Sequence, residues 1–185
     1  MRIIAGKFKG RTLATPSSQA VRPTSDRLRE SIFNILTHAH DDVIEGARVL
    51  DLFAGTGALG IEALSRGAAH ALFVDDSTEG RGLLRENVER LGLGGVTKVF
   101  RRDATKLGPC HPHAPFSLVF CDPPYRKGLG EQALAAARAG GWLLPDAMIV
   151  FEEAAEAAVT LPEGFEEVDR RAYGDTQIII ASVKA

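Results

Sequence analysis

Three glycines and one acidic residue have the spacing of a site that binds a nucleotide-containing cofactor. In VLDLFAGTGALGIEALSRGA, Gly55, Gly57 and Gly60 match the pattern G-x-G-x-x-G, and Asp75 follows Gly55 by twenty positions. Such glycines allow a tight turn between a strand and a helix, and the later carboxylate can accept hydrogen bonds from ribose hydroxyls. The spacing predicts a Rossmann-type nucleotide site, and by itself it also fits a dinucleotide enzyme.

Asp51, just before the glycine turn, favours one cofactor over the other. A pyrophosphate would approach the helix terminus at this point, and a carboxylate beside it would repel it. S-adenosylmethionine carries a sulfonium and an α-ammonium but no phosphate, so Asp51 favours it over NAD. Asp103, in RRDA, is placed to reach the adenine amino group. The predicted cofactor residues are Asp51, Phe53, Gly55, Thr56, Gly57, Asp75, Asp76, Asp103 and Ala104.

A second cluster, FCDPPYRKG, follows the fourth predicted strand and is suited to hold a planar amine. Prolines have no N–H group, so a ligand amine there meets only acceptors, the nearby carbonyls and the Asp122 carboxylate. Tyr125 can stack on a base extruded into the pocket. We predict that the catalytic residues are Asp122, Pro123, Pro124 and Tyr125.

Charge is unevenly distributed along the chain. The net charge is −2, but residues 1–37 carry seven basic and two acidic side chains, and the remainder carries 15 basic and 22 acidic ones. A basic segment on an acidic body indicates a polyanionic partner, although a solvated basic arm fits the charge alone equally well. The predicted RNA contacts are Lys9, Arg11, Arg22, Thr24, Arg27 and Arg126.

Short β-branched runs alternate with longer helical runs, which predicts βαβ units and a mostly parallel sheet. Two final runs, Phe165–Tyr173 and Thr176–Val183, are separated only by Gly174 and Asp175, which predicts an antiparallel hairpin. The other predicted strands, with helices between them, are Arg48–Phe53, Ala71–Asp75, Lys98–Arg101, Ser117–Cys121 and Met148–Glu152.

Two helices have recognisable starts. RPTSDRLRESIFNIL has an apolar face that should dock and a basic face that should stay free, with Thr24 or Ser25 as the cap. Asp76 and Glu79 can form a capping box before the helix that follows the second strand. We expect residues 1–40 to form a basic N-terminal extension that contacts RNA, an extended segment followed by the first helix, and residues 41–185 to form the catalytic domain.

Length and composition exclude several classes of protein. A chain of 185 residues fits one domain with a short appendage, and no apolar run approaches the roughly 18 residues of a membrane span. The basic start lacks the apolar stretch of a signal peptide, so we expect a cytoplasmic protein. Cys110 and Cys121 form no CxxC pair, which excludes a disulfide scaffold. His111 and His113 lie with Cys110 in a proline-rich loop that we expect to be solvated, and no metal site is predicted.

The motifs resemble those of known families. DPPY after the fourth strand resembles the [DNS]PP[YFW] motif of amino-directed methyltransferases. RIIAGKFKGRTL, RPTSDRLRESIFNIL, VLDLFAGTGALGIEALSRGA, DPPY and YGDT occur in the order found in the RsmD family, the small-subunit (16S) ribosomal RNA guanine-N2 methyltransferases, so the resemblance covers nearly the whole chain.

This resemblance implies an α/β, Rossmann-like fold that binds S-adenosylmethionine, with a mostly parallel seven-stranded sheet. It implies that Asp51, Gly55 and Gly57 line the methionine part, Asp75 the ribose and Asp103 the adenine, while Asp122 to Tyr125 hold the base. Members of the family often have Glu at the ribose position. Because Asp75 is followed by Asp76 here, either acid can be the ribose ligand.

The sequence therefore predicts methyl transfer to the exocyclic N2 amine of a guanine in ribosomal RNA, within an assembled small subunit or a late precursor. Acceptors on Asp122 and the Pro123 carbonyl would draw the amine toward tetrahedral geometry and free its lone pair. The alternatives are an adenine-N6 methyltransferase acting on DNA or RNA, an NAD-dependent oxidoreductase, and an RNA-binding assembly factor without turnover. The intact glycine turn and DPPY argue against the last.

Overall fold

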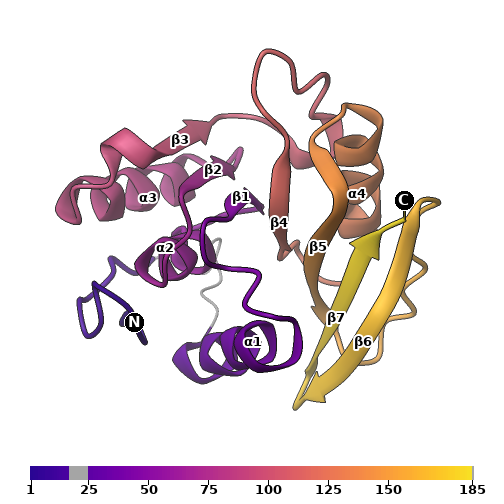
Figure 1. Ribbon diagram of the computed structural model, residues 1–185, viewed down its shortest axis with the longest axis horizontal. Coiled ribbons are helices and arrows are strands. Elements are labelled where there is room, and N and C mark those ends of the chain that lie inside the picture. Colours follow the sequence, from indigo (N-terminus) through magenta and orange to yellow (C-terminus); the bar gives the residue numbers. More distant parts are fainter. Residues whose placement is uncertain (17–24, 185) are drawn as a thin grey trace.

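The protein is built on one seven-stranded sheet, seen in a computed structural model that describes residues 1–16 and 25–184 (Figure 1). The strands are β1 (Arg48–Leu52), β2 (His70–Val74), β3 (Thr97–Phe100), β4 (Phe116–Cys121), β5 (Leu143–Ala154), β6 (Phe165–Tyr173) and β7 (Thr176–Val183). Their order across the sheet is β3-β2-β1-β4-β5-β7-β6. Only the β5–β7 and β6–β7 pairs are antiparallel, which confirms the predicted parallel sheet with a C-terminal hairpin.

The strand register brings the two predicted functional segments to one edge of the sheet. Leu52, the last residue of β1, pairs with Val74 at the end of β2 and with Cys121 at the end of β4. The glycine turn after β1, Asp75 after β2 and Asp122 after β4 therefore leave the sheet side by side. Ligands of open α/β sheets bind at this carboxyl edge.

Four helices connect or flank the strands in the described part of the chain: α1 (Asp26–Ala39), α2 (Ala58–Ser65), α3 (Thr78–Arg90) and α4 (Leu129–Ala139). Ser25 caps α1 as predicted, its hydroxyl accepting the Leu28 N–H at 3.1 Å. The predicted capping box of Asp76 and Glu79 is wrong, because Ser77 caps α3 by accepting the Gly80 N–H. None of these helices is long and apolar enough to cross a bilayer.

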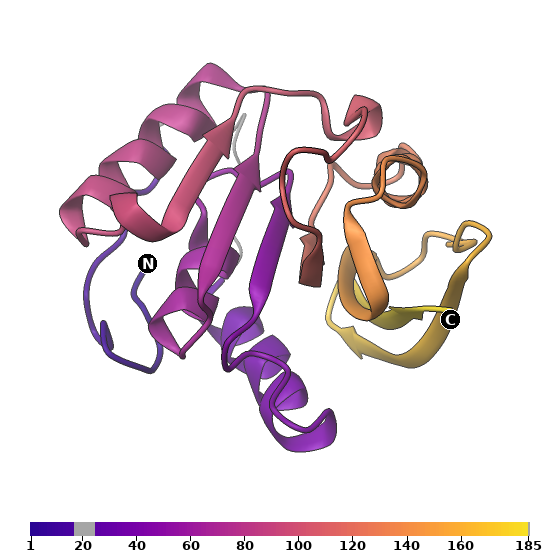
Figure 2. The same ribbon diagram turned by 45° about the horizontal axis from the view of Figure 1, so that its top comes forward.

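The two faces of the sheet are covered differently (Figure 2). Val49, Ala71 and Phe73 belong to a hydrophobic cluster with α1, α2 and α3, whereas Leu50 and Leu72 belong to a second cluster that includes α4. In Figure 2, α3 lies along one side of β2 and β3. On their other side, Ala104 and Leu107 of the connection between β3 and β4 belong to the cluster of Leu72.

The connection from β3 to β4 contains no α-helix, which corrects the expectation of a helix between every pair of parallel strands. It has one 3-10 turn, Ala104–Lys106, and then an irregular loop over residues 107–115. Three prolines, at positions 109, 112 and 115, remove backbone donors and interrupt any helix there. The loop is also less solvated than predicted, since Cys110 is buried in the second cluster and the His113 ring lies 5.2 Å from that of Phe100.

The N-terminal segment packs into the body of the protein. Ile3, Leu13 and Phe33 share one hydrophobic cluster with Val49 of β1. The parts of the chain before and after residue 40 therefore share a core. The division of the chain at that residue stays a prediction.

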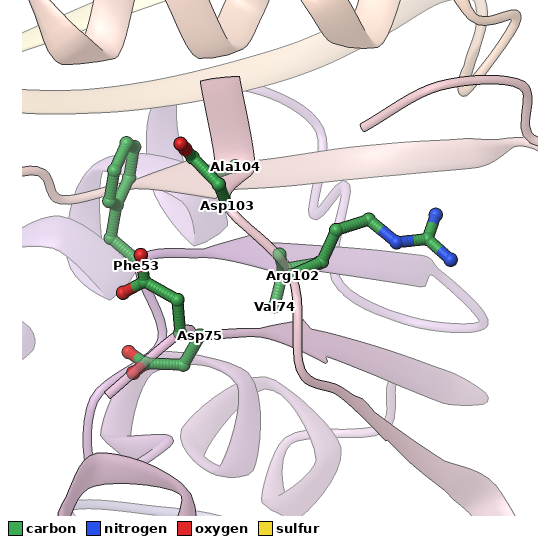
Figure 3. A pocket seen from close by; sticks show the side chains of 7 residues that line it. Phe53, Val74, Asp75, Arg102, Asp103 and Ala104 are labelled. Atoms are coloured by element: carbon green, nitrogen blue, oxygen red, sulfur yellow. The ribbon is translucent and has the colours of Figure 1, made fainter. Parts of the chain in front are cut away.

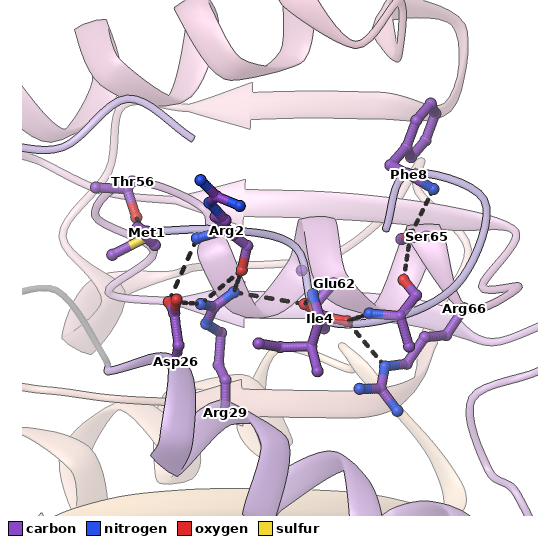
Figure 4. A network of polar contacts seen from close by, with 12 residues as sticks. Met1, Arg2, Ile4, Phe8, Asp26, Arg29, Thr56, Glu62, Ser65 and Arg66 are labelled. Carbon is purple, nitrogen blue, oxygen red and sulfur yellow. Dashed lines mark hydrogen bonds and ion pairs between the residues drawn. The ribbon is translucent and has the colours of Figure 1, made fainter. Parts of the chain in front are cut away.

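A buried polar network fastens this segment to α2 (Figure 4). The Glu62 carboxylate accepts the N–H groups of Ile4 and Ala5 at 2.9 and 3.1 Å. It also forms ion pairs with Arg29 at 3.4 Å and Arg66 at 2.9 Å. Arg29, from α1, is fully buried, so the prediction that the basic face of this helix is free is wrong at that residue.

Candidate cofactor and base-binding site

The glycine turn after β1 has a backbone that few side chains tolerate. Gly55 and Gly57 have φ of 57° and 80°, in the left-handed region that glycine adopts without strain. A Cβ at Gly60, in the first turn of α2, would lie 2.5 Å from the Phe73 ring. The third glycine of the motif therefore allows α2 to pack closely on β2.

Asp51 lies beneath this turn, where its carboxylate accepts the Gly60 N–H at 3.0 Å. A carboxylate thus already occupies the start of α2, where a pyrophosphate would bind. Burial raises the pKa of Asp51 well above its ordinary value; the Gly60 hydrogen bond lowers it, and the nearby Asp75 raises it further. Its contact with the methionine part of a cofactor stays a prediction.

A pocket opens at the carboxyl ends of the strands, beside the turn (Figure 3). Its lining includes five of the nine predicted cofactor residues, Phe53, Asp75, Asp76, Asp103 and Ala104. Val74 and Arg102 also line it and were not predicted. Figure 3 shows the Arg102 guanidinium directed away from Asp75 and Phe53.

The carboxylates of the pocket are held in place by neighbouring donors. Asp75 accepts the Gly55 N–H at 2.7 Å, and both the N–H and the hydroxyl of Ser77 at 2.8 and 2.7 Å. Asp103 accepts the hydroxyl and N–H of Thr105, and these two bonds lower the pKa of Asp103. The adjacent Asp76 is exposed. The pocket therefore presents fixed acceptors, which suit hydroxyl and amino donors and repel a phosphate.

The Thr56 side chain points away from the pocket lining, and the predicted contact of this residue with the cofactor stays a prediction. Its side chain is buried, with the hydroxyl 3.9 Å from the Met1 sulfur, and its carbonyl accepts the Asn87 side-chain amide. Asn87 in turn accepts the N–H of Ala14 at 2.7 Å. Thr56 and Asn87 therefore connect the turn to the N-terminal segment.

The DPPY segment leaves β4 at the same edge. Pro123 is buried and Pro124 exposed, while Asp122 and Tyr125 are half-buried. The Tyr125 hydroxyl donates to Glu152 at 2.6 Å and lies 3.0 Å from the Thr176 hydroxyl. Because its single proton goes to Glu152, the Thr176 hydroxyl is left to donate to the phenolic oxygen. Two strands thus fix the ring of Tyr125.

Sequence reasoning missed the residues that hold the DPPY loop. Glu152 lies near the end of β5, and Thr176 is the first residue of β7. Glu153, next to Glu152, accepts the Arg126 N–H at 2.9 Å. Two signals could have found them, the adjacent acids that follow an apolar strand run and the threonine of the YGDT motif.

The predicted RNA contacts lie in different places. Lys9, Arg11 and Arg27 are exposed, and Arg11 also donates to the Arg90 carbonyl at 3.2 Å. Arg126 is exposed on the DPPY loop and pairs with Glu156. The remaining two, Arg22 and Thr24, lie outside the described residues.

Comparisons with known proteins agree on one family. The family model described as "Conserved hypothetical protein 95" matches residues 1–182. Ribosomal RNA small subunit methyltransferase D of Escherichia coli is 40% identical over 84% of this chain and 76% of its own length. The protein of the same name from Haemophilus influenzae is 34% identical over 94% of this chain and 89% of its own.

A solved structure is also similar to this chain over its whole length. The yhhF protein of Escherichia coli has a TM-score of 0.84 and 35% sequence identity, covering 100% of this chain and 98% of that one. The sheet, the glycine turn and the DPPY loop described above lie within the matched length. The chain belongs to the RsmD family, whose curated members are the ribosomal RNA small subunit methyltransferases D.

Proposed function

We propose that this cytoplasmic protein transfers a methyl group from S-adenosylmethionine to the exocyclic N2 amine of a guanine in small-subunit ribosomal RNA. One observation carries the proposal: a pocket of fixed carboxylates and the DPPY loop lie at the same edge of the sheet. The name of the Escherichia coli relative supports the RNA substrate.

The pocket residues fit the chemistry of this cofactor. Asp75 or Asp76 would accept the ribose hydroxyls, Asp103 the adenine amino group, and Phe53 with Ala104 would contact the apolar faces of the base. When bound, S-adenosylmethionine supplies an electrophilic methyl group and a neutral thioether leaving group. No metal is part of the proposal.

The DPPY loop would hold the acceptor amine. Asp122 and the Pro123 carbonyl would accept hydrogen bonds from the two amine N–H groups, turning the nitrogen lone pair out of conjugation with the ring and toward the methyl carbon. The methylated nitrogen would then release one proton to Asp122 or to water. Tyr125, fixed by Glu152 and Thr176, would stack on the base. Positioning then supplies most of the acceleration, since no strong base is needed before transfer.

A methyl-transfer assay tests the function. Small subunits from a strain that lacks this protein would be incubated with it and isotopically labelled S-adenosylmethionine, and the RNA then digested to nucleosides. We expect labelled N2-methylguanosine. N6-methyladenosine would establish the adenine alternative, and tight binding of particles without any transfer would establish an assembly factor.

Asp75 and Asp76 should contribute unequally to cofactor binding. Asp75→Ala removes a ribose acceptor and also the partner of the Gly55 N–H, so the cofactor affinity should fall by about 1 to 3 kcal/mol. Asp76→Ala, at an exposed position, should change it much less. Isothermal calorimetry measures both. A larger loss of cofactor affinity for Asp76→Ala than for Asp75→Ala would assign the ribose contact to Asp76 instead.

The basic N-terminal residues should provide RNA affinity independently of the cofactor. Replacing Lys9, Arg22 and Arg27 together by Ala should flatten the dependence of small-subunit binding on salt, because fewer counterions are released. Cofactor affinity should be unchanged in the same variant. An unchanged salt slope would refute this assignment. Because these few residues can contact only a short stretch of RNA, we expect the protein to recognise a preformed RNA shape and to methylate assembled particles faster than naked RNA.

A further inference from the structure

Several basic side chains gather on the sheet face opposite α2 and α3, beside the part of that face on which α4 packs. Arg48 and His70 are register partners at the start of β1 and β2, and Lys98 of β3 pairs with Leu72. By strand alternation these three point to the same side as Leu50 and Leu72, the side opposite α2 and α3. Lys98 is exposed, and Arg48 and His70 are half-buried. The β3–β4 connection covers Leu50 and Leu72 on this face but leaves Lys98 exposed at its edge.

The connection that replaces the helix adds two more basic groups, interleaved with aromatic rings. Arg102 lies over the Phe100 ring at 5.0 Å, and His113 meets the same ring edge-on. Arg48 lies over the Phe116 ring at 4.9 Å. We call Arg48, His70, Lys98, Arg102 and His113 the open-face cluster.

Positive charge in this cluster is not neutralised within the protein. Among the described residues, no carboxylate forms an ion pair with Arg48, Lys98 or Arg102, whereas Arg66, Arg90, Arg126, Arg170 and Arg171 all have one. Burial lowers the pKa of His70 and of His113, and the charges that lower these pKa values further all come from the basic residues of the cluster. Uncompensated cations on an acidic protein indicate an anionic partner.

The two guanidinium groups are held in fixed positions by the backbone. Arg48 donates to the carbonyls of Pro115 and Ala114 at 3.1 and 3.0 Å, and Arg102 to that of Leu107 at 2.8 Å. Cations whose side chains are already ordered lose less conformational entropy when they bind.

We propose that the open-face cluster is a second RNA-contact surface, which binds the phosphate backbone of ribosomal RNA away from the base that is methylated. The proposal rests on the proposed function for the identity of the RNA. Arg102 also lines the proposed cofactor pocket, whereas Arg48 and His70 lie at the start of β1 and β2, so the cluster extends from that pocket to the opposite ends of these strands. Guanidinium groups held over the Phe100 and Phe116 rings suit the phosphate backbone.

The test compares two variants that remove the same charge. Arg48→Gln, Lys98→Gln and Arg102→Gln together remove three positive charges and keep an N–H donor on each side chain. The matched control replaces three exposed basic residues elsewhere by Gln: Arg85, Arg138 and Lys184. Binding of purified small subunits is measured from low to high salt for both variants, with melting temperature and cofactor affinity as controls of folding.

The cluster variant should bind small subunits about tenfold more weakly, with a slope of log affinity against log salt reduced by about 2, since each phosphate contact contributes about 0.7 to 0.9. The control should keep the slope of the natural protein. Equal slopes in all three proteins would overturn the proposal, and so would an equal reduction in the control.

A single substitution at an exposed position keeps the proposal testable if the triple variant does not fold. Lys98→Glu should weaken binding more than Lys98→Gln, because it places a carboxylate against phosphate; equal affinities of these two variants would overturn the proposal. Measuring how binding depends on salt requires no methyl transfer. Absence of methyl transfer by the natural protein would therefore overturn the proposed function, and unchanged slopes with normal transfer would overturn only the second surface.

Discussion

Asp122→Ala should reduce methyl transfer to ribosomal RNA by at least about 100-fold, the scale seen when one preorganised polar group is removed from a reacting centre. Asp122 leaves β4 beside the cofactor pocket, and its carboxylate is the charged acceptor of the DPPY loop. Single-turnover kinetics on small subunits would measure the loss. Cofactor affinity should stay within about twofold, because Asp122 is not part of the lining of that pocket.

The more informative variant is Asp122→Asn. Guanine presents N1–H and the N2 amine side by side, two donors that a carboxylate can accept together. The amide would place its own donor against one of them, so methylation of guanine should be strongly impaired. Adenine presents an amine beside an acceptor, and an amide suits that edge better than a carboxylate does.

A matched control for these variants is Glu163→Ala, which removes an exposed acid and should leave turnover unchanged. Digestion of the RNA to nucleosides identifies the product in each case. Full activity of Asp122→Asn on guanine, or N6-methyladenosine as the natural product, would show that the donor and acceptor pattern does not select the base.

Glu62→Ala should lower the free energy of unfolding by about 3 to 5 kcal/mol, because it breaks a buried ion pair of Arg29, which keeps only Asp26, and leaves two N–H groups without their acceptor. Glu62 and Arg29 are both fully buried, and the same carboxylate accepts the N–H groups of Ile4 and Ala5. For a domain of this size the melting temperature should fall by roughly 6 to 20 °C. Chemical denaturation at low temperature measures the difference.

The control for this prediction is Glu86→Ala. Glu86 forms an exposed pair with Arg90 on α3, and such pairs contribute less than about 1 kcal/mol. If Glu62→Ala is no more destabilising than Glu86→Ala, the network around Glu62 does not fasten the N-terminal segment.

Local signals in the sequence predicted the elements that depend on local chemistry. The bounds of β6 and β7 match the prediction to the residue, because Gly174 and Asp175 make the turn between them. The glycine turn and the cap at Ser25 were predictable for the same reason.

Long-range contacts were not predictable in this way. Thr176 is 51 positions from Tyr125, and nothing near either residue indicates that they meet. Arg29 lies on the same face of α1 as the buried Ile32 and Leu36, and its charge can be buried there because Glu62 of α2, 33 positions away, pairs with it. The absence of a helix after β3 has a local cause that is visible in the sequence, the prolines of the loop. A prediction from the alternation of strand and helix patterns alone does not take them into account.

The position of β7 has a consequence for how the protein is made. β7 follows β6 in the chain but lies between β5 and β6 in the sheet. During translation, β6 leaves the ribosome before β7, the strand with which it pairs at the edge of the sheet, has been synthesised. Thr176, which anchors Tyr125, arrives with that last inner strand. A nascent chain can therefore form its glycine turn early, but Tyr125 gains its contact with Thr176 only once β7 has been translated.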